Sequence, residues 1–86
     1  MVFKSIVVQN HSGFHNRQVT LFVQKANEFD CSISLERGTQ RINAKSLLGV
    51  MCFEVQTGES ITIRTNGIDE EAALSTMESF LLNDIH

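Results

Sequence analysis

The chain has 86 residues, enough for a small hydrophobic core, so we expect residues 1–86 to form a single domain. Its formal net charge is -3 and its lysines and arginines form no run, which argues against nucleic acid as a partner. No apolar stretch approaches the roughly 20 residues that span a bilayer, and the N-terminus lacks the apolar core of a signal peptide. We therefore expect a cytoplasmic protein without membrane insertion.

The first two predicted elements are a strand and a helix. Residues 3–8 are rich in β-branched side chains and predict a strand, which the polar segment 10–13 ends. From residue 16 to residue 27, apolar side chains recur at helical spacing and predict a helix with one buried stripe. That stripe comprises Val19, Phe22, Val23 and Ala26. A second face of the helix is polar and offers a docking strip, although any solvated helix face has the same pattern. It carries Arg17, Thr20, Gln24 and Asn27.

Alternating side chains predict the next strands. Residues 31–36 alternate apolar and polar side chains, which indicates a strand with one dry face and one wet face. A turn over 37–40 leads to a short return strand over 41–44. Residues 60–65 alternate again, between turns at 57–59 and 66–67. Asp69 then predicts the cap of a last helix. The apolar stripe of this helix comprises Ala73, Leu74, Met77, Phe80 and Leu81.

Ser46 stands before the apolar segment 47–53, which it can cap as a helix of two turns. At about 100° per residue, Val50 and Phe53 share one side of that helix. The other side carries Leu47, Leu48 and Met51. A domain this small cannot bury both sides, so one apolar side is expected at the surface, where such patches mark partner sites. The alternative is that the segment forms a fully buried strand.

One-sided strands require an antiparallel sheet that helices cover on one face. The predicted order is β-α-β-β-α-β-α, and the fold class is α+β, an open-faced sandwich. Cys31 and Cys52 are the two cysteines, and each lies in an otherwise apolar pattern. Reduced thiols are the simplest account of them, although a disulfide stays open. Their spacing does not fit a zinc site, so we expect neither a metal nor another cofactor.

His15 lies directly before the first predicted helix, in the segment Gly-Phe-His-Asn-Arg at 13–17. The start of a helix leaves backbone N–H groups without partners and carries the positive end of the helix dipole, so it attracts phosphate. Arg17 adds a permanent cation nearby. The arrangement indicates a histidine that carries a phosphoryl group, although five such residues by themselves more often mean a polar loop residue that caps a helix.

Over essentially its whole length the chain resembles the HPr family, the phosphocarrier proteins of the bacterial sugar phosphotransferase system. The resemblance rests on Gly13-Phe14-His15-x-Arg17, on Leu-Phe-Val-Gln at 21–24 and on Asn-Ala-Lys-Ser-Leu-Leu-Gly-Val-Met at 43–51. The turn at 57–58 and the entry to the last helix at 67–70 are in register with the family too. The resemblance implies the same open-faced sandwich, a four-stranded antiparallel sheet that three helices cover on one face.

The resemblance also implies that His15 is the phosphorylated residue of a phosphotransfer intermediate rather than of a turnover enzyme. In the family, enzyme I donates the phosphoryl group and sugar-specific IIA domains accept it. Ser46 matches the serine that an HPr kinase/phosphorylase modifies in carbon catabolite control, which adds that kinase and a catabolite-control regulator to the implied partners. The matching docking surface comprises Thr20, Gln24, Asn27, Leu47, Leu48 and Met51.

Around His15 the chain departs from the family, whose usual pattern is His-Ala-Arg-Pro followed by Ala or Ser. Gln18 stands at the proline position, where it restores a backbone N–H and loosens the first helical turn. Asn16 places an amide beside the imidazole. We expect Asn16 and Gln18 to line the phosphate cradle, with His15 and Arg17 in the transfer itself. Three functions stay open: a working phosphocarrier, an HPr-like regulatory binding protein with weak or no phosphotransfer that acts through the Ser46 surface, and an unrelated small interaction domain.

Overall fold

The computed structural model describes residues 1–8 and 16–82, with the backbone alone at 16 and 17. The elements follow the predicted order. They are β1 (Val2–Val7), α1 (Asn16–Ala26), β2 (Ser32–Arg37), β3 (Gln40–Asn43), α2 (Leu47–Phe53), β4 (Ser60–Asn66) and α3 (Glu70–Leu82). The segment 47–53 is the predicted helix, so the alternative of a buried strand is wrong.

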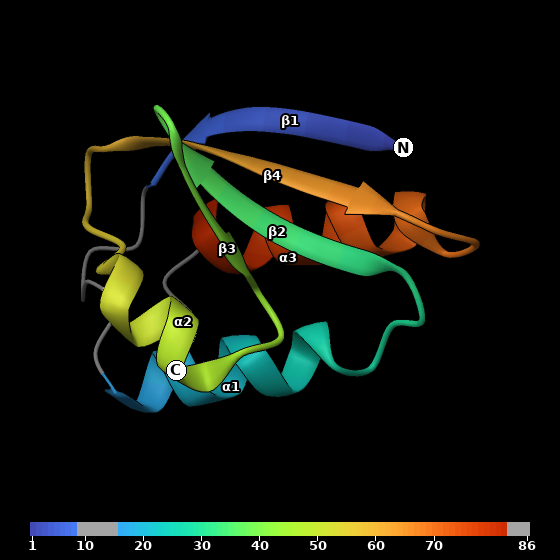
Figure 1. Cartoon of the computed structure of the whole chain (residues 1–86), viewed down its shortest axis with the longest axis horizontal. Coiled ribbons are helices and arrows are strands. Elements are labelled where there is room, and N and C mark those ends of the chain that lie inside the picture. Colours follow the sequence, from blue (N-terminus) through green and yellow to red (C-terminus); the bar gives the residue numbers. More distant parts are fainter. Residues whose placement is uncertain (9–15, 83–86) are drawn as a thin grey trace.

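The four strands form one antiparallel sheet in the order β1-β4-β2-β3 (Figure 1). The later strand β4 lies between two earlier ones, because it pairs with β1 through Ile6 and Ile61 and with β2 through Leu35 and Ile63. The strands β2 and β3 form a hairpin, in which Leu35 lies opposite Ile42. The predicted open-faced sandwich is thereby confirmed, and the register places the apolar residues of neighbouring strands side by side.

The core lies between one face of the sheet and the helices. Strand residues alternate between the two faces, so the isoleucines and the leucine of β2 and β4 point to the same side. Ile33, Leu35, Ile61 and Ile63 are each 2% exposed or less. The predicted stripe of α1 is buried, and Phe22 packs edge-on against Phe80 of α3 with 5.5 Å between the ring centroids. In Figure 1, α3 passes behind the sheet, and α1 and α2 pack against each other below it.

Asp69 joins the start of α3 to the loop between α1 and β2. It stands at the predicted cap position, since its carbonyl accepts the N–H of Ala73 at 3.0 Å. Its carboxylate accepts the N–H groups of Asp30 at 2.8 Å and of Cys31 at 2.9 Å. These bonds, that of Asp30 first, hold the pKa of the Asp69 carboxyl below its usual value. The side chain therefore links segments that are almost 40 residues apart.

The two cysteines are free thiols in different environments. Cys31 is buried and Cys52 is exposed. Burial, together with a hydrogen bond to Asp69, raises the pKa of the Cys31 thiol to about 11. Cys31 also lies against Gly67, whose φ is +151°, and a Cβ at Gly67 would stand 2.6 Å from the Cα of Cys31. Only glycine fits that position.

Candidate functional site

The first part of the candidate site is the start of α1. This helix has 11 residues and begins at Asn16, so His15 is the residue before it. His15 lies outside the described residues, as do the side chains of Asn16 and Arg17. The predictions for these three residues therefore stay predictions. The first turn of α1 contains no acidic residue. No carboxylate of the helix itself thus competes with an anion at its start.

Gln18, in the first turn of α1, has a buried side chain that is only 8% exposed. Its Oε1 is buried as well, and within the described part of the chain it accepts no hydrogen bond. An amide in this position does not lie open to a phosphate in solvent. The group of Gln18 that suits an anion is the backbone N–H, which belongs to the first turn and needs a partner from outside the helix.

Ser46 caps α2, as the sequence predicts. Its backbone is extended, with φ -99° and ψ 116°, and its Oγ accepts the N–H of Gly49 at 3.1 Å. Its carbonyl accepts the N–H of Val50 at 3.0 Å. Gly49 approaches the cap closely, since a Cβ on it would lie 3.3 Å from the Ser46 hydroxyl. The hydroxyl thus stands at the start of α2 on a side chain that is partly exposed.

Beside Ser46, α2 presents the predicted apolar patch, which we define as Leu47, Leu48 and Met51. These side chains are 45%, 72% and 43% exposed, whereas Val50 and Phe53 on the other side of the helix are buried. The prediction that one apolar side of α2 lies at the surface is confirmed. On the neighbouring helix α1, the side chains of Thr20 and Gln24 are exposed as well. Because α1 and α2 pack against each other, both sets belong to one pair of helices.

Hydrogen bonds of Asn27 and Lys45 connect the start of α2 to the end of α1 and the loop that follows it. The Asn27 amide donates to the carbonyls of Val23 at 2.8 Å and of Lys45 at 3.1 Å. The Lys45 ammonium donates to the carbonyl of Phe29 at 2.6 Å. Asn27 thus also has a structural role within the predicted docking surface. Lys45 was not predicted as part of the site, because its partner is 16 residues away and the sequence pattern carries no signal for that contact.

Arg37 of β2 holds the other end of α2. Its guanidinium lies 4.2 Å from the centroid of the Phe53 ring and donates to the Phe53 carbonyl at 2.7 Å. It also donates to both carboxylate oxygens of Glu59 at 2.9 Å and to the amide oxygen of Gln40 at 2.9 Å. Glu59 in turn accepts the N–H of Gln56 at 2.9 Å. The orientation of the short helix α2 is therefore set by cationic side chains at both ends.

Within the ranges 1–8 and 16–82, no group of three or more His, Cys, Asp or Glu side chains is placed to share a metal ion. In the same ranges, no helix combines the length and the apolar character that a membrane crossing requires.

The described geometry defines a class of protein: an open-faced sandwich with a histidine directly before α1 and a capping serine before α2. The sequence model of one family, the PTS HPr component phosphorylation site, matches residues 2–83. The chain therefore belongs to the HPr family of the phosphotransferase system.

Similar proteins carry the same family name. The phosphocarrier protein HPr of Treponema pallidum (strain Nichols) is 43% identical over 83 residues, which cover 96% of this chain and 94% of that protein. The HPr-like protein Crh of Halalkalibacterium halodurans is 37% identical over 81 residues, or 94% of this chain and 96% of that protein. The crystal structure of a phosphocarrier protein HPr from Bacillus anthracis superimposes with a TM-score of 0.88 at 39% identity, covering 93% of this chain and 95% of that one.

Proposed function

We propose that this protein is a cytoplasmic phosphocarrier whose His15 accepts a phosphoryl group from enzyme I and passes it to sugar-specific IIA domains. The observation that carries the proposal is the family match over residues 2–83 combined with the start of α1 at the residue after His15. The apolar patch on α2 and the exposed polar side chains of α1 support it, because a carrier must dock on several partners through one surface.

In the proposed transfer, the ring nitrogen of His15 that bears no proton attacks the phosphorus of a phosphohistidine on the donor. A new N–P bond forms as the donor's N–P bond breaks, and the donor ring keeps the electron pair of the broken bond. The backbone N–H groups at the start of α1 and the Arg17 guanidinium neutralise the phosphoryl oxygens. The positive end of the dipole also favours a neutral imidazole.

The expected strength of this cradle suits a carrier. A helix start contributes about 0.3–1 kcal/mol per charge when exposed, and about 2 kcal/mol when partly buried. The phosphoryl group is thus held weakly enough to leave again. The docking surface then selects the partners: Thr20, Gln24, Asn27, Leu47, Leu48 and Met51.

The test is incubation with enzyme I and phosphoenolpyruvate, followed by mass spectrometry of the intact protein. We expect one acid-labile phosphoryl group in the wild type and none in His15→Ala. The matched control is His11→Ala, which removes a histidine of the same segment and is expected to keep the label. A label that persists in His15→Ala contradicts the proposal.

A second function is favoured by Ser46 and by the departures at Asn16 and Gln18. In this alternative the protein is an HPr-like regulatory binding protein, as the similarity to the protein named Crh suggests. Its weak or absent phosphotransfer would leave phosphorylation of Ser46 by an HPr kinase/phosphorylase as the switch. A phosphate on Ser46 would stand at the start of α2, beside Leu47 and Leu48, and its charge would favour a catabolite-control regulator over partners that need the patch dry.

The two functions make different predictions in two assays. The regulator predicts no transfer from enzyme I, together with a label on Ser46 after treatment with an HPr kinase. Mapping of the modified residue by peptide mass spectrometry checks this, with Ser46→Ala as the control. A kinase label on any other residue would remove the role of Ser46.

A further inference from the structure

The loop that follows α2, residues 54–59, is bonded to the chain at the point where it leaves β1. The N–H of Val8 donates to the carbonyl of Glu59 at 3.0 Å, and the N–H of Gly58 donates to the carbonyl of Val8 at 2.9 Å. Val8 is 2% exposed and directly precedes the segment 9–15, which contains His15. The loop after α2 therefore holds the residue from which that segment starts.

The carboxylate of Glu59 orders this loop. Both of its oxygens accept from the Arg37 guanidinium at 2.9 Å, and Oε1 also accepts the N–H of Gln56 at 2.9 Å. The side chains of Arg37 and Glu59 are 32% and 21% exposed. Charges that are partly shielded from water are screened less than exposed ones, so this pair holds the loop more firmly than a surface ion pair would.

Arg37 reaches both the loop and α2 because of its place on β2. Side chains alternate along a strand, so Arg37 lies on the same face as the fully buried Leu35, the face that the helices cover. At that end of β2 its guanidinium donates to the Phe53 carbonyl at 2.7 Å and lies 4.2 Å from the centroid of the Phe53 ring. One side chain thus contacts the last residue of α2 and the loop beyond it.

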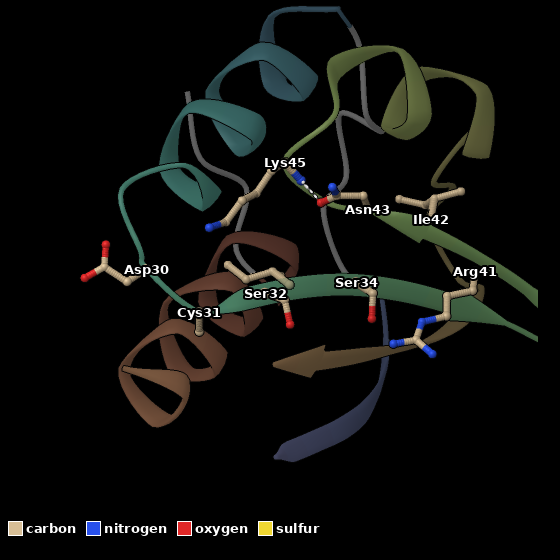
Figure 2. Close-up of a pocket in the computed structure, with 9 residues that line it drawn as sticks. Asp30, Cys31, Ser32, Ser34, Arg41, Ile42, Asn43 and Lys45 are labelled. Atoms are coloured by element: carbon tan, nitrogen blue, oxygen red, sulfur yellow. Dashed lines mark hydrogen bonds between the residues drawn. The ribbon is translucent and has the colours of Figure 1, made fainter. Parts of the chain in front are cut away.

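The neighbouring strand carries an arginine that lacks this placement. Arg41 of β3 lies opposite Glu36, the residue before Arg37, and therefore on the other face of the sheet. In Figure 2 its side chain extends from β3 away from that of Ile42, which packs against the core. Arg41 thus provides the same charge on the adjacent strand without the position of Arg37.

We propose that Arg37 is a positioning residue for phosphotransfer. Through Phe53 it sets the direction of α2 and hence of the apolar patch. Through Glu59 it sets the loop that holds Val8, where the segment that carries His15 leaves the sheet. One guanidinium thereby fixes the place where a partner docks relative to the place from which the transfer segment starts. The inference rests on the proposed function and adds to it a residue outside the docking surface and the phosphate cradle.

The test is the steady-state rate at which enzyme I and phosphoenolpyruvate phosphorylate each variant, resolved into kcat and KM for this protein. Arg37→Met should raise KM and lower kcat, and kcat/KM should fall about fivefold or more, because small displacements far from the chemistry can cost up to about a hundredfold. Glu59→Gln should lower kcat with little change in KM, since its contact leads to Val8. The double variant should be within about twofold of Arg37→Met, because residues that act through one contact are not additive.

Two controls separate positioning from charge and from stability. Arg41→Met removes the same charge from the adjacent strand, and Ile33→Val removes a methyl group from the core and so lowers stability. Both should keep kcat and KM within about twofold of the wild type. All rates are measured where circular dichroism shows that every variant is folded, so that a loss of transfer is not a loss of structure.

Equal kcat/KM in Arg37→Met and the two controls would overturn the positioning role, as would fully additive effects of Arg37→Met and Glu59→Gln. A wild type that takes no label contradicts the proposed function instead, and amide hydrogen exchange then decides the positioning role. Arg37→Met should quicken exchange at Val8 and over α2 together, whereas Arg41→Met should leave both unchanged. Unchanged exchange at Val8 in Arg37→Met would overturn the inference.

Discussion

Arg37 contacts Phe53 in two ways, with its guanidinium over the face of the ring and with a hydrogen bond to the backbone carbonyl. The guanidinium lies 4.2 Å from the ring centroid, and its Nη2 donates to the Phe53 carbonyl at 2.7 Å. That carbonyl belongs to the last turn of α2, where carbonyls lack partners inside the helix. The last turn of α2 has no basic residue of its own. A strand residue thus supplies the positive charge that the C-terminal end of the helix favours.

Removal of this contact should loosen α2. We expect Arg37→Met to lower the free energy of unfolding by about 2 kcal/mol, because a partly buried charged hydrogen bond and a cation–π contact are lost together. Urea unfolding measures the change, and amide hydrogen exchange should quicken over α2. The control is Arg41→Met, an exposed arginine of the neighbouring strand, with an expected loss under about 0.5 kcal/mol. Equal losses in the two variants would contradict the role of Arg37.

Glu54 follows α2 with φ 55° and ψ 69°, the left-handed conformation. It is the only residue other than glycine with a positive φ in the part of the chain that the structure describes. Glu54→Gly should therefore stabilise the protein by about 1 kcal/mol, since glycine adopts this conformation without steric cost. Thermal unfolding checks the gain. Gln56→Gly, two residues further on, should instead destabilise through added freedom of the unfolded chain. A shift of both variants in the same direction would refute this account.

Gln18 buries an amide oxygen that has no donor among the described residues. We expect Gln18→Met to raise the free energy of unfolding by about 1 kcal/mol, because methionine has a similar shape and leaves no unsatisfied acceptor. The comparison is Gln24→Met, at an exposed position of the same helix, which should change stability little. The midpoints of denaturant unfolding of the two variants and the wild type measure these changes in stability. A loss of stability in Gln18→Met would mean that its amide is bonded in the native protein.

Asp69 makes stability depend on pH in a defined direction. The two N–H groups that its carboxylate accepts lower its pKa from the ordinary 3.8. A lowered pKa contributes stability that is present above the unfolded-state pKa and is lost as the pH falls through the folded-state pKa. In Asp69→Asn, the side-chain amide keeps one oxygen acceptor but places its NH₂ group against the second backbone N–H. Near pH 7 the variant should therefore unfold at a lower temperature than the wild type.

The difference between Asp69→Asn and the wild type should shrink as the pH falls from the ordinary carboxyl pKa of 3.8 through the lower folded-state pKa, because the folded wild-type carboxylate becomes protonated only there. Thermal unfolding at a series of pH values measures it. Asp30→Asn, a neighbouring exposed carboxylate, serves as the control and should have little effect on the melting temperature. A difference that stays constant down to the lowest pH would refute the assigned role of the Asp69 carboxylate.

The part of the candidate site around α2 could be predicted from local patterns, whereas the predictions for His15, Asn16 and Arg17 stay predictions. Ser46 precedes two apolar helical turns, and capping depends only on the next three residues, so its contact with Gly49 followed from the sequence. The exposed patch on α2 was predictable because a domain this small cannot bury both apolar sides of a short helix. Asn27 was harder, because its position on the polar face of α1 was predictable while its bond to Lys45 required the packing of two helices.

The sequence by itself determined which segments are strands and helices and which face of each is apolar, because periodicity depends on near neighbours along the chain. The tertiary structure alone decided which distant groups meet. The insertion of β4 between β1 and β2 brings Arg37 to Glu59, and the packing of α3 brings the Asp69 carboxylate to Cys31. Such contacts leave no local signature, since each partner satisfies its hydrogen bonds equally well with water until the chain folds.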